Sequence, residues 1–253
     1  GRGDGVDQAG TLYVRSFIAP VMRDGWGDLV SLSNVTNGRV AGSRSITSLD
    51  VPMAAIERVE VLGGADSIVV GGPMEPGGSV NIVTKQPVAD TLREWTLEVD
   101  NRGHRRSALD LGGSLTENRA WTYRTILSAT HDKRTLDGYD GAREFYLAAS
   151  LGYKDRDTAV VAGLSHHVTR SPFGGYQSAM LTDTGPGPDL RNAPWGLPDD
   201  HSQATKSELF YRWEQDLGDG WRLNSKARLT RLRYHSAGYT SCSQVDLDEG
   251  TGV

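Results

Sequence analysis

Residues 55–87 read AIERVEVLGGADSIVVGGPMEPGGSVNIVTKQP. The stretch contains the glycine pairs Gly63-Gly64, Gly71-Gly72 and Gly77-Gly78, which permit tight corners and close backbone approach. The sequence before Pro87 consists of short, glycine-rich, irregular segments of this kind. After Pro87 the pattern changes, so we expect two structural regions that meet near this residue.

The region after Pro87 shows the period-two alternation of apolar and polar residues that indicates β-strands. Seven such stretches follow one another, at 95–99, 107–111, 121–127, 145–153, 160–164, 209–213 and 221–229. No helical pattern separates them. Consecutive strands without crossover helices form an antiparallel meander, so we predict a seven-stranded antiparallel sheet.

The connections between these stretches alternate in length. From the second onward they are short, long, short, long and short, namely 116–120, 131–143, 154–157, 169–205 and 218–220. In an up-and-down sheet, alternate connections lie at opposite edges. One edge then has only tight turns and the other has long loops, which is typical of outer-membrane barrels.

The two faces of the predicted sheet differ in chemistry. Trp121, Tyr153, Trp213 and Trp221 lie near short turns on the apolar face, and Trp95 begins the first strand at the same edge, as expected for an aromatic girdle at a membrane interface. The opposite face is polar and contains Glu98, Asp110, Arg124, Arg212, Glu214, Asn224, Lys226 and Arg228. A soluble sheet with one solvated face would give the same alternation. The turn asymmetry and the aromatic positions favour a barrel with a wet lumen.

Composition excludes several other classes of protein. The 253 residues carry a net charge of −5 and a single cysteine, so neither a nucleic-acid-binding surface nor an intrachain disulfide framework is expected. No apolar run approaches the roughly 18–20 residues of a membrane helix. The chain begins without an initiator Met or a leader pattern and ends in a polar stretch, and seven strands are too few for a closed membrane barrel of this type. We therefore expect a piece of a longer chain.

Residues 55–87 resemble the C-terminal part of the plug domain of TonB-dependent outer-membrane receptors. That family has an "IERIEV" strand, matched here by 56–61, and a "PGG.INIVTK.P" segment, matched by 76–87. Upstream, 14–17 (VRSF) resembles the family's "RGF" element, and Asp24-Gly25 its "DG". The chain departs from the family at Gly64-Ala65, where the family has Gly-Pro, and at 69–71, where it has Leu-Tyr-Gly. These departures weaken the transfer of individual ligand contacts.

The resemblance implies a mainly β fold in two parts. Residues 1–88 would be the C-terminal portion of a plug domain, with strands at 59–61 and 80–82. Residues 89–253 would be the start of a transmembrane β-barrel, the first seven or so antiparallel strands of 22, incomplete in this chain. Four charged residues of the plug are expected to pair with the polar wall of the barrel: Glu57, Arg58, Glu60 and Lys85.

The resemblance also implies a function. The segment 171–176 (SPFGGY) looks most like ferric-siderophore receptors. Such a receptor takes up a ferric siderophore by TonB-dependent transport in the outer membrane of a Gram-negative cell. Its partners are the TonB–ExbB–ExbD complex, the iron–siderophore ligand and outer-membrane lipid, but no nucleic acid. It is a monomer when full length, uses no cofactor and has no direct metal site.

Two alternatives remain open at this point. One is a TonB-dependent importer of another ligand, such as a cobalamin, heme or an oligosaccharide. The other is a soluble β-rich adhesin or binding module that uses Arg2-Gly3-Asp4 as its contact. An enzyme is not expected, because the sequence has neither a Gly-x-Ser-x-Gly elbow nor a zinc-protease histidine pair. The rings of His166 and His167 should face opposite sides of a strand and could not share a metal.

The candidate ligand-binding residues are aromatic or basic, because such side chains stack on and pair with a planar anionic chelate. On the plug apices they are Arg15, Phe17, Trp26 and Arg44, and on the barrel loops they are Phe173, Tyr176, Trp195 and Tyr239. The ordinary alternative is that the aromatics pack within their own loops and that the arginines are solvated.

Overall fold

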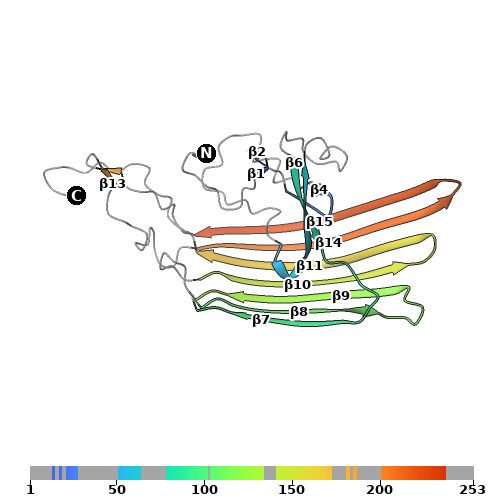
Figure 1. Cartoon of the computed structure of the whole chain (residues 1–253), viewed down its shortest axis with the longest axis horizontal. Helices are drawn as coiled ribbons and strands as arrows, with labels where there is room; N and C mark the ends of the chain where they lie inside the picture. The colour runs from blue at the N-terminus through green and yellow to red at the C-terminus, as the bar shows by residue number, and fades with distance from the viewer. Residues whose placement is uncertain are drawn as a thin grey trace.

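The computed structural model describes residues 13–14, 17–18, 21–27, 51–63, 78–101, 103–133, 141–172, 181–182, 185–186 and 201–237 (Figure 1). The elements are β1 (Tyr13–Val14), β2 (Phe17–Ile18), β3 (Val21–Arg23), β4 (Trp26–Gly27), the 3-10 turn η1 (Met53–Ala55), β5 (Ile56–Gly63), β6 (Gly78–Thr84), β7 (Leu92–Val99), β8 (Arg105–Ser114), β9 (Trp121–His131), β10 (Arg143–Lys154), β11 (Thr158–Pro172), β12 (Leu181–Thr182), β13 (Gly185–Pro186), β14 (His201–Gly218) and β15 (Trp221–Ala237). Within these ranges no helix has the length and apolar character to cross a membrane.

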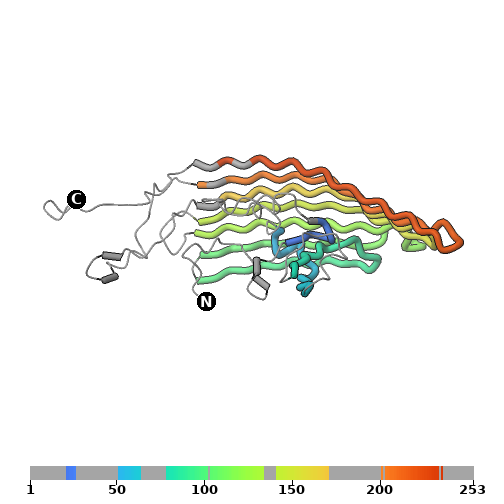
Figure 2. The backbone as a smooth tube through the Cα atoms, turned by 90° about the horizontal axis from the view of Figure 1, so that it is seen from above, coloured from blue at the N-terminus to red at the C-terminus, as the bar shows by residue number. Residues whose placement is uncertain are grey.

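The largest unit is a seven-stranded antiparallel sheet, which we call the wall. Its strand order is β15-β14-β11-β10-β9-β8-β7, so that each long strand pairs with the next one along the chain (Figure 1). The wall is an open sheet whose outer strands are β7 and β15, and Figure 2 shows its long strands side by side. The predicted seven-stranded meander is confirmed.

The bounds predicted for the loop at 169–205 are wrong at both ends. Strand β11 continues to Pro172 and β14 begins at His201, and the two pair in register as far as Pro172 opposite His201. The residues in this extension are mostly polar, so their side chains give no apolar alternation. The backbone ladder continues nevertheless, because its hydrogen bonds do not depend on side-chain polarity.

The wall has an apolar outer face and a polar inner face, as predicted. On the outer face Trp95, Trp121 and Trp221 are 68%, 45% and 73% exposed. Trp121 and Tyr153 lie directly opposite each other on β9 and β10, with their ring centroids 4.9 Å apart. The inner face contains the buried charged residues Asp110, Arg124, Lys206 and Glu208.

A four-stranded sheet, which we call the small sheet, has the order β4-β3-β6-β5. β5 and β6 pair antiparallel, which confirms the strands predicted at 59–61 and 80–82, and β3 joins β6 in parallel. The β3–β4 hairpin turns at Asp24 and Gly25, with φ of 53° and 71°. Two consecutive positive φ values define the type I′ turn, for which Asp-Gly is a favoured sequence.

The apolar core lies between the small sheet and the inner face of the wall. Its buried side chains come from both sides, namely Val21, Val51, Ala54, Ala55, Val80, Ile82, Ala108, Ile126 and Tyr146. The segment that leaves the small sheet runs along the wall, where Val88 forms a bridge to Tyr123. A Cβ on Gly152 would lie 2.6 Å from Thr122 Oγ1 and 3.2 Å from the Cβ of Pro87. The glycine therefore makes room for this segment on the inner face.

Replacing Gly152 with leucine should lower the free energy of unfolding by about 1–3 kcal/mol, because overpacking forces neighbouring side chains and backbone to shift. The measurement is denaturant unfolding of the full-length gene product in detergent. Ala162→Leu is the control, since Ala162 is exposed on the outer face of β11. Equal stability of the two variants would mean that Gly152 has no packing role.

Candidate functional site

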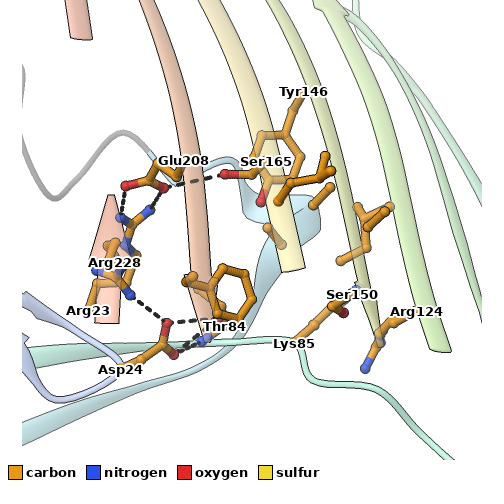
Figure 3. Close-up of a pocket in the computed structure, with 16 residues that line it drawn as sticks. Arg23, Asp24, Thr84, Lys85, Arg124, Tyr146, Ser150, Ser165, Glu208 and Arg228 are labelled. Carbon is orange, nitrogen blue, oxygen red and sulfur yellow. Dashed lines mark hydrogen bonds and ion pairs between the residues drawn. The ribbon is translucent and has the colours of Figure 1, made fainter. Parts of the chain in front are cut away.

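The tip of the β3–β4 hairpin is fixed to the wall by a buried ion pair (Figure 3). Arg23 Nη1 donates to Glu208 Oε2 at 2.6 Å, and Arg23 Nη2 pairs with Glu208 Oε1. The side chains are only 13% and 5% exposed. Glu208 also accepts hydrogen bonds from Thr230 Oγ1 at 3.0 Å and Ser165 Oγ at 3.4 Å. The carboxylate is therefore surrounded by donors, as a buried charge requires.

Arg23 keeps its charge in this setting. Burial by itself would lower the pKa of the guanidinium, but the hydrogen bonds and negative charge of Glu208 outweigh burial, and the pKa is raised. The pair is thus a charged, bidentate contact, the geometry in which arginine and carboxylate bind most strongly.

Asp24, the next residue in the hairpin, joins three strands. Its Oδ1 accepts from the backbone N–H of Thr84 at 2.8 Å and from Thr84 Oγ1 at 3.0 Å, which ties the turn to β6. Its Oδ2 accepts from Arg228 Nη2 of β15 at 3.3 Å. A single carboxylate therefore orders the turn and contacts the wall.

Trp26 lies on cationic side chains of β15. Lys226 Nζ is 4.5 Å from the centroid of the indole ring, and the guanidinium of Arg228 is 5.6 Å from it. Lys226 Nζ also donates to the Gly25 carbonyl at 3.3 Å. Of the predicted ligand-binding residues, Trp26 is the one whose side chain the structure describes, and it packs against the wall. Its contact with a ligand stays a prediction.

A second charged cluster fixes the end of β6. Lys85 Nζ donates to Asp110 Oδ2 at 2.8 Å. Arg124 donates to both oxygens of Asp110, at 2.9 and 2.8 Å, and through Nη1 to the Gln86 carbonyl at 3.1 Å. The predicted pairing of Lys85 with the wall is confirmed, and Glu57 Oε2 lies 3.8 Å from Arg124 Nη1.

Arg58 and Glu60 do not pair with the described strands of the wall. Arg58 Nη2 pairs with Glu60 Oε1 at 2.7 Å on an exposed part of β5. Glu60 Oε2 accepts from Asn81 Nδ2 at 2.8 Å, and Asn81 Oδ1 in turn accepts from the Gly25 N–H at 3.0 Å. These charges therefore order the small sheet internally. The reason is the strand register, which places Glu60 opposite Asn81.

A small cavity lies between the two charged clusters, and Figure 3 shows the side chains around it. Its lining is mixed, with Tyr146, Ser150 and Ser165 of the wall facing Thr84 and Lys85 of the small sheet. The pairs between the two sheets join oppositely charged groups, and no group of three or more His, Cys, Asp or Glu side chains in the described residues is arranged to hold a metal ion. The arrangement holds the two sheets together through paired charges and hydrogen bonds.

Most of the predicted ligand-binding residues lie outside the described part of the chain: Arg15, Arg44, Phe173, Tyr176, Trp195 and Tyr239. Phe17 is described only as a backbone position of β2. His166 and His167 are described and face opposite sides, as predicted. His166 Nδ1 lies 2.9 Å from Ser207 Oγ, whereas His167 Nε2 lies 2.8 Å from Glu144 Oε1.

Sequence reasoning missed Arg23 and Glu208. Glu208 has the same strand parity as the predicted wall residue Arg212, and Arg23 immediately precedes the Asp-Gly turn. Those signals place Glu208 on the polar face of the wall and Arg23 next to the hairpin turn. They do not pair them, because 185 positions separate the two in the sequence.

Known proteins with a similar sequence are receptors. The ferric-pyoverdine BN7/BN8 receptor of Pseudomonas putida is 26% identical over 225 residues, which are 83% of this chain and 27% of the relative. The probable TonB-dependent receptor BfrD of Bordetella pertussis is 31% identical over 186 residues, 70% of this chain and 24% of the relative. The chain thus spans about a quarter of the length of these relatives. No protein-family model matches.

The structural comparison gives the same answer for the fold. The pyoverdine outer membrane receptor FpvA of Pseudomonas aeruginosa PAO1, bound to pyoverdine, superposes with a TM-score of 0.74 at 22% identity, over 89% of this chain and 32% of that one. Wall and small sheet therefore correspond to the barrel and plug of an outer-membrane receptor. The chain belongs to the TonB-dependent receptors of the outer membrane. The alternative of a soluble adhesin has no support among these relatives.

Removing one partner of the Arg23–Glu208 pair should lower the free energy of unfolding by about 3–5 kcal/mol, because the other charge is left buried. Arg23→Met, Glu208→Gln and the double variant form a cycle that isolates the pair, measured by denaturant unfolding of the full-length product. Arg58→Gln is the control, since the Arg58–Glu60 pair is 60% and 35% exposed and should contribute less than about 1 kcal/mol. A coupling energy near zero would contradict the role of the pair as an anchor.

Glu60 should make stability depend on pH. The hydrogen bond from Asn81 and the contact with Arg58 lower the pKa of its carboxyl. A lowered pKa stabilises the fold above the unfolded value, and this contribution is lost as the pH falls through the folded value. The stability difference between the parent and Glu60→Gln should therefore shrink between about pH 7 and pH 3. Glu117→Gln, in the β8–β9 turn, is the control. A difference that stays constant with pH would exclude this role.

Proposed function

We propose that the chain is the plug-bearing part of a receptor that imports a ferric siderophore across the outer membrane, driven by TonB with ExbB and ExbD. The proposal is supported by the relatives, which include a ferric-pyoverdine receptor, and by the fold shared with a pyoverdine receptor. The observation that carries it is the mode of attachment between the two sheets. The hairpin tip and the end of β6 are held to the wall by charged pairs.

Such an attachment suits a part that must move. An importer has to hold its plug at rest and shift it during transport. Separating the two sheets would expose the small apolar core between them and lose its hydrophobic contribution. A charged pair opens at a smaller net cost if water can replace its hydrogen bonds, since the net contribution of a hydrogen bond is far smaller than its gross strength. The polar inner face of the wall is compatible with entry of that water.

The ligand would bind on the loop side, at the candidate residues of the plug apices and barrel loops named above. Aromatic rings and arginines there would stack on and pair with an anionic iron chelate. Binding and passage require no bond to be made or broken in the ligand. The full-length protein would act as a monomer. The rival within the same class is an importer of a cobalamin, heme or an oligosaccharide.

The test is uptake by a Gram-negative host that lacks its own siderophore receptors and expresses the full-length gene. Radioactive iron is supplied as pyoverdine, hydroxamate or catecholate complexes. We expect one of these classes to be accumulated in a TonB-positive host. A TonB-deficient host should bind the same complex at its surface without accumulating it.

Competition separates the rival ligands in the same assay. Excess cobalamin, heme or oligosaccharide should leave iron uptake unchanged. Uptake of cobalamin, heme or sugar without uptake of any iron chelate would replace the siderophore with that ligand. Accumulation that is equal in the TonB-deficient host would contradict active import.

A further inference from the structure

Two cations lie directly opposite each other on the inner face of β14 and β15. The strand register places Arg212 opposite Lys226, and Arg212 has the same strand parity as the inner-face residue Glu208. Lys226 reaches the β3–β4 hairpin from the same face, where its Nζ donates to the Gly25 carbonyl at 3.3 Å. Like charges directly opposite each other on neighbouring strands destabilise a sheet. The wall therefore contains a repulsive pair at this level.

Arg212 has no anionic partner within the described residues. In that part of the chain its guanidinium forms no hydrogen bond and no ion pair. The other cations at the hairpin and at the end of β6 differ. Arg23 and Lys85 each pair with a carboxylate of the wall, and Arg228 pairs with Asp24. The charge of Arg212 is thus available to a further anion.

Lys226 is held by neutral groups. Besides the hairpin carbonyl, it contacts the indole ring of Trp26, whose centroid is 4.5 Å from Nζ. Its charge is repelled by Arg212 and Arg228 and attracted by Asp24. The carboxylate of Asp24 already accepts hydrogen bonds from β6 and from Arg228. Lys226 therefore has no carboxylate of its own.

The acid two positions further along this face of β14 is Glu214, opposite Asn224. Its side chain is exposed, and within the described strands it forms no ion pair with Arg212 or Lys226. The two cations thus still have donors to offer, a guanidinium fork on one strand and an ammonium on the next. Neighbouring strands lie about 4.8 Å apart, so that both groups can reach one oxyanion.

The pair lies beyond the hairpin anchor as seen from the loops. Arg212 is four residues from Glu208 toward the turn at 218–220, about 13 Å along the strand. The loop side, where the ligand of the proposed importer first binds, is at the opposite end of the strands. A ligand that moves along the inner face from the loops therefore reaches Arg212 only after it has passed the anchor.

We propose that Arg212 and Lys226 form a second site for the imported ligand and bind a carboxylate or similar oxyanion of it during passage. The inference rests on the proposed import of an anionic iron chelate. Such a chelate is repelled by the carboxylates of Glu208 and Asp24 as it passes them, and the two cations offset this repulsion. The indole of Trp26, beside Lys226, offers a flat surface on which a chelate can stack.

The first test measures the site directly with citrate, a soluble polycarboxylate, on the full-length product in detergent. Acetylation of Lys226 by an N-hydroxysuccinimide ester is followed by peptide mass spectrometry. Citrate should slow this reaction several-fold, because a bound carboxylate covers the ammonium, and should leave the exposed Lys154 unchanged. Sodium chloride at the same ionic strength separates binding from screening. Arg212→Gln should need about tenfold more citrate for the same protection.

Equal protection by chloride, or equal protection by citrate in the parent and in Arg212→Gln, would overturn the proposal. Arg212 is the residue to change, because it makes no contact with the hairpin that its loss could weaken.

The second test measures uptake of radioactive iron as pyoverdine, hydroxamate and catecholate complexes in the hosts described above. In Arg212→Gln the maximal TonB-dependent rate should fall about tenfold, while surface binding in the TonB-deficient host should match that of the parent. Arg212→Lys keeps the charge and should restore most of the rate. Arg231→Gln removes the same charge from the outer face of β15 and should behave like the parent.

The two tests separate this inference from the proposed function. Parent uptake with an equal maximal rate in Arg212→Gln would overturn the inference and leave the importer standing. Weaker surface binding with an unchanged maximal rate would also overturn it, because Arg212 would then act at the loop-side site. Protection of Lys226 by citrate without uptake of any iron complex would contradict the proposed function and the role in passage, while the anion site would be confirmed.

Discussion

The buried carboxylates of the wall must be neutralised, and this requirement organises the inner side of the molecule. Glu208 and Asp110 are both buried, on a face that also contains Arg124 and Lys206. Isolated charges in such positions would be costly. Arg23 of the small sheet pairs with Glu208, and Lys85 joins the wall residue Arg124 in neutralising Asp110. The small sheet is therefore positioned by charge, and the apolar core around Ala55 and Ile126 fills the space that remains.

The same requirement explains the local chemistry of the small sheet. The type I′ turn at Asp24-Gly25 places one arginine and one aspartate at the tip of a short hairpin. The aspartate accepts one hydrogen bond from the backbone N–H of Thr84 and another from Arg228. Gly152 makes room on the wall for the segment that follows. The type I′ turn, the two charged residues at its tip and the absence of a side chain at Gly152 together determine how the two sheets pack.

The wall could be predicted from sequence because strand alternation is a local property. The two-residue alternation alone placed Trp121, Tyr153 and Trp221 on the outer face of the wall. It also predicted that the opposite face is polar. The ends of β11 and β14 could not be predicted, since their polar residues continue a backbone ladder without an apolar signal. The pairing of Lys85 with the wall was predictable from resemblance and charge. The pairing of Arg23 with Glu208 was not, because it depends on how a hairpin meets a strand far along the chain.

The order in which the strands pair has a consequence for how the protein folds. Every neighbour in the wall is the next long strand in the chain, so each hairpin forms with little loop-closure entropy. The contacts of the β3–β4 hairpin with β14 and β15 instead close loops of 185 and 204 residues. The hairpin can therefore reach its final position only once β14 and β15 have formed. Until then its charged tip has to stay hydrated, which an arginine and an aspartate in a tight turn do readily.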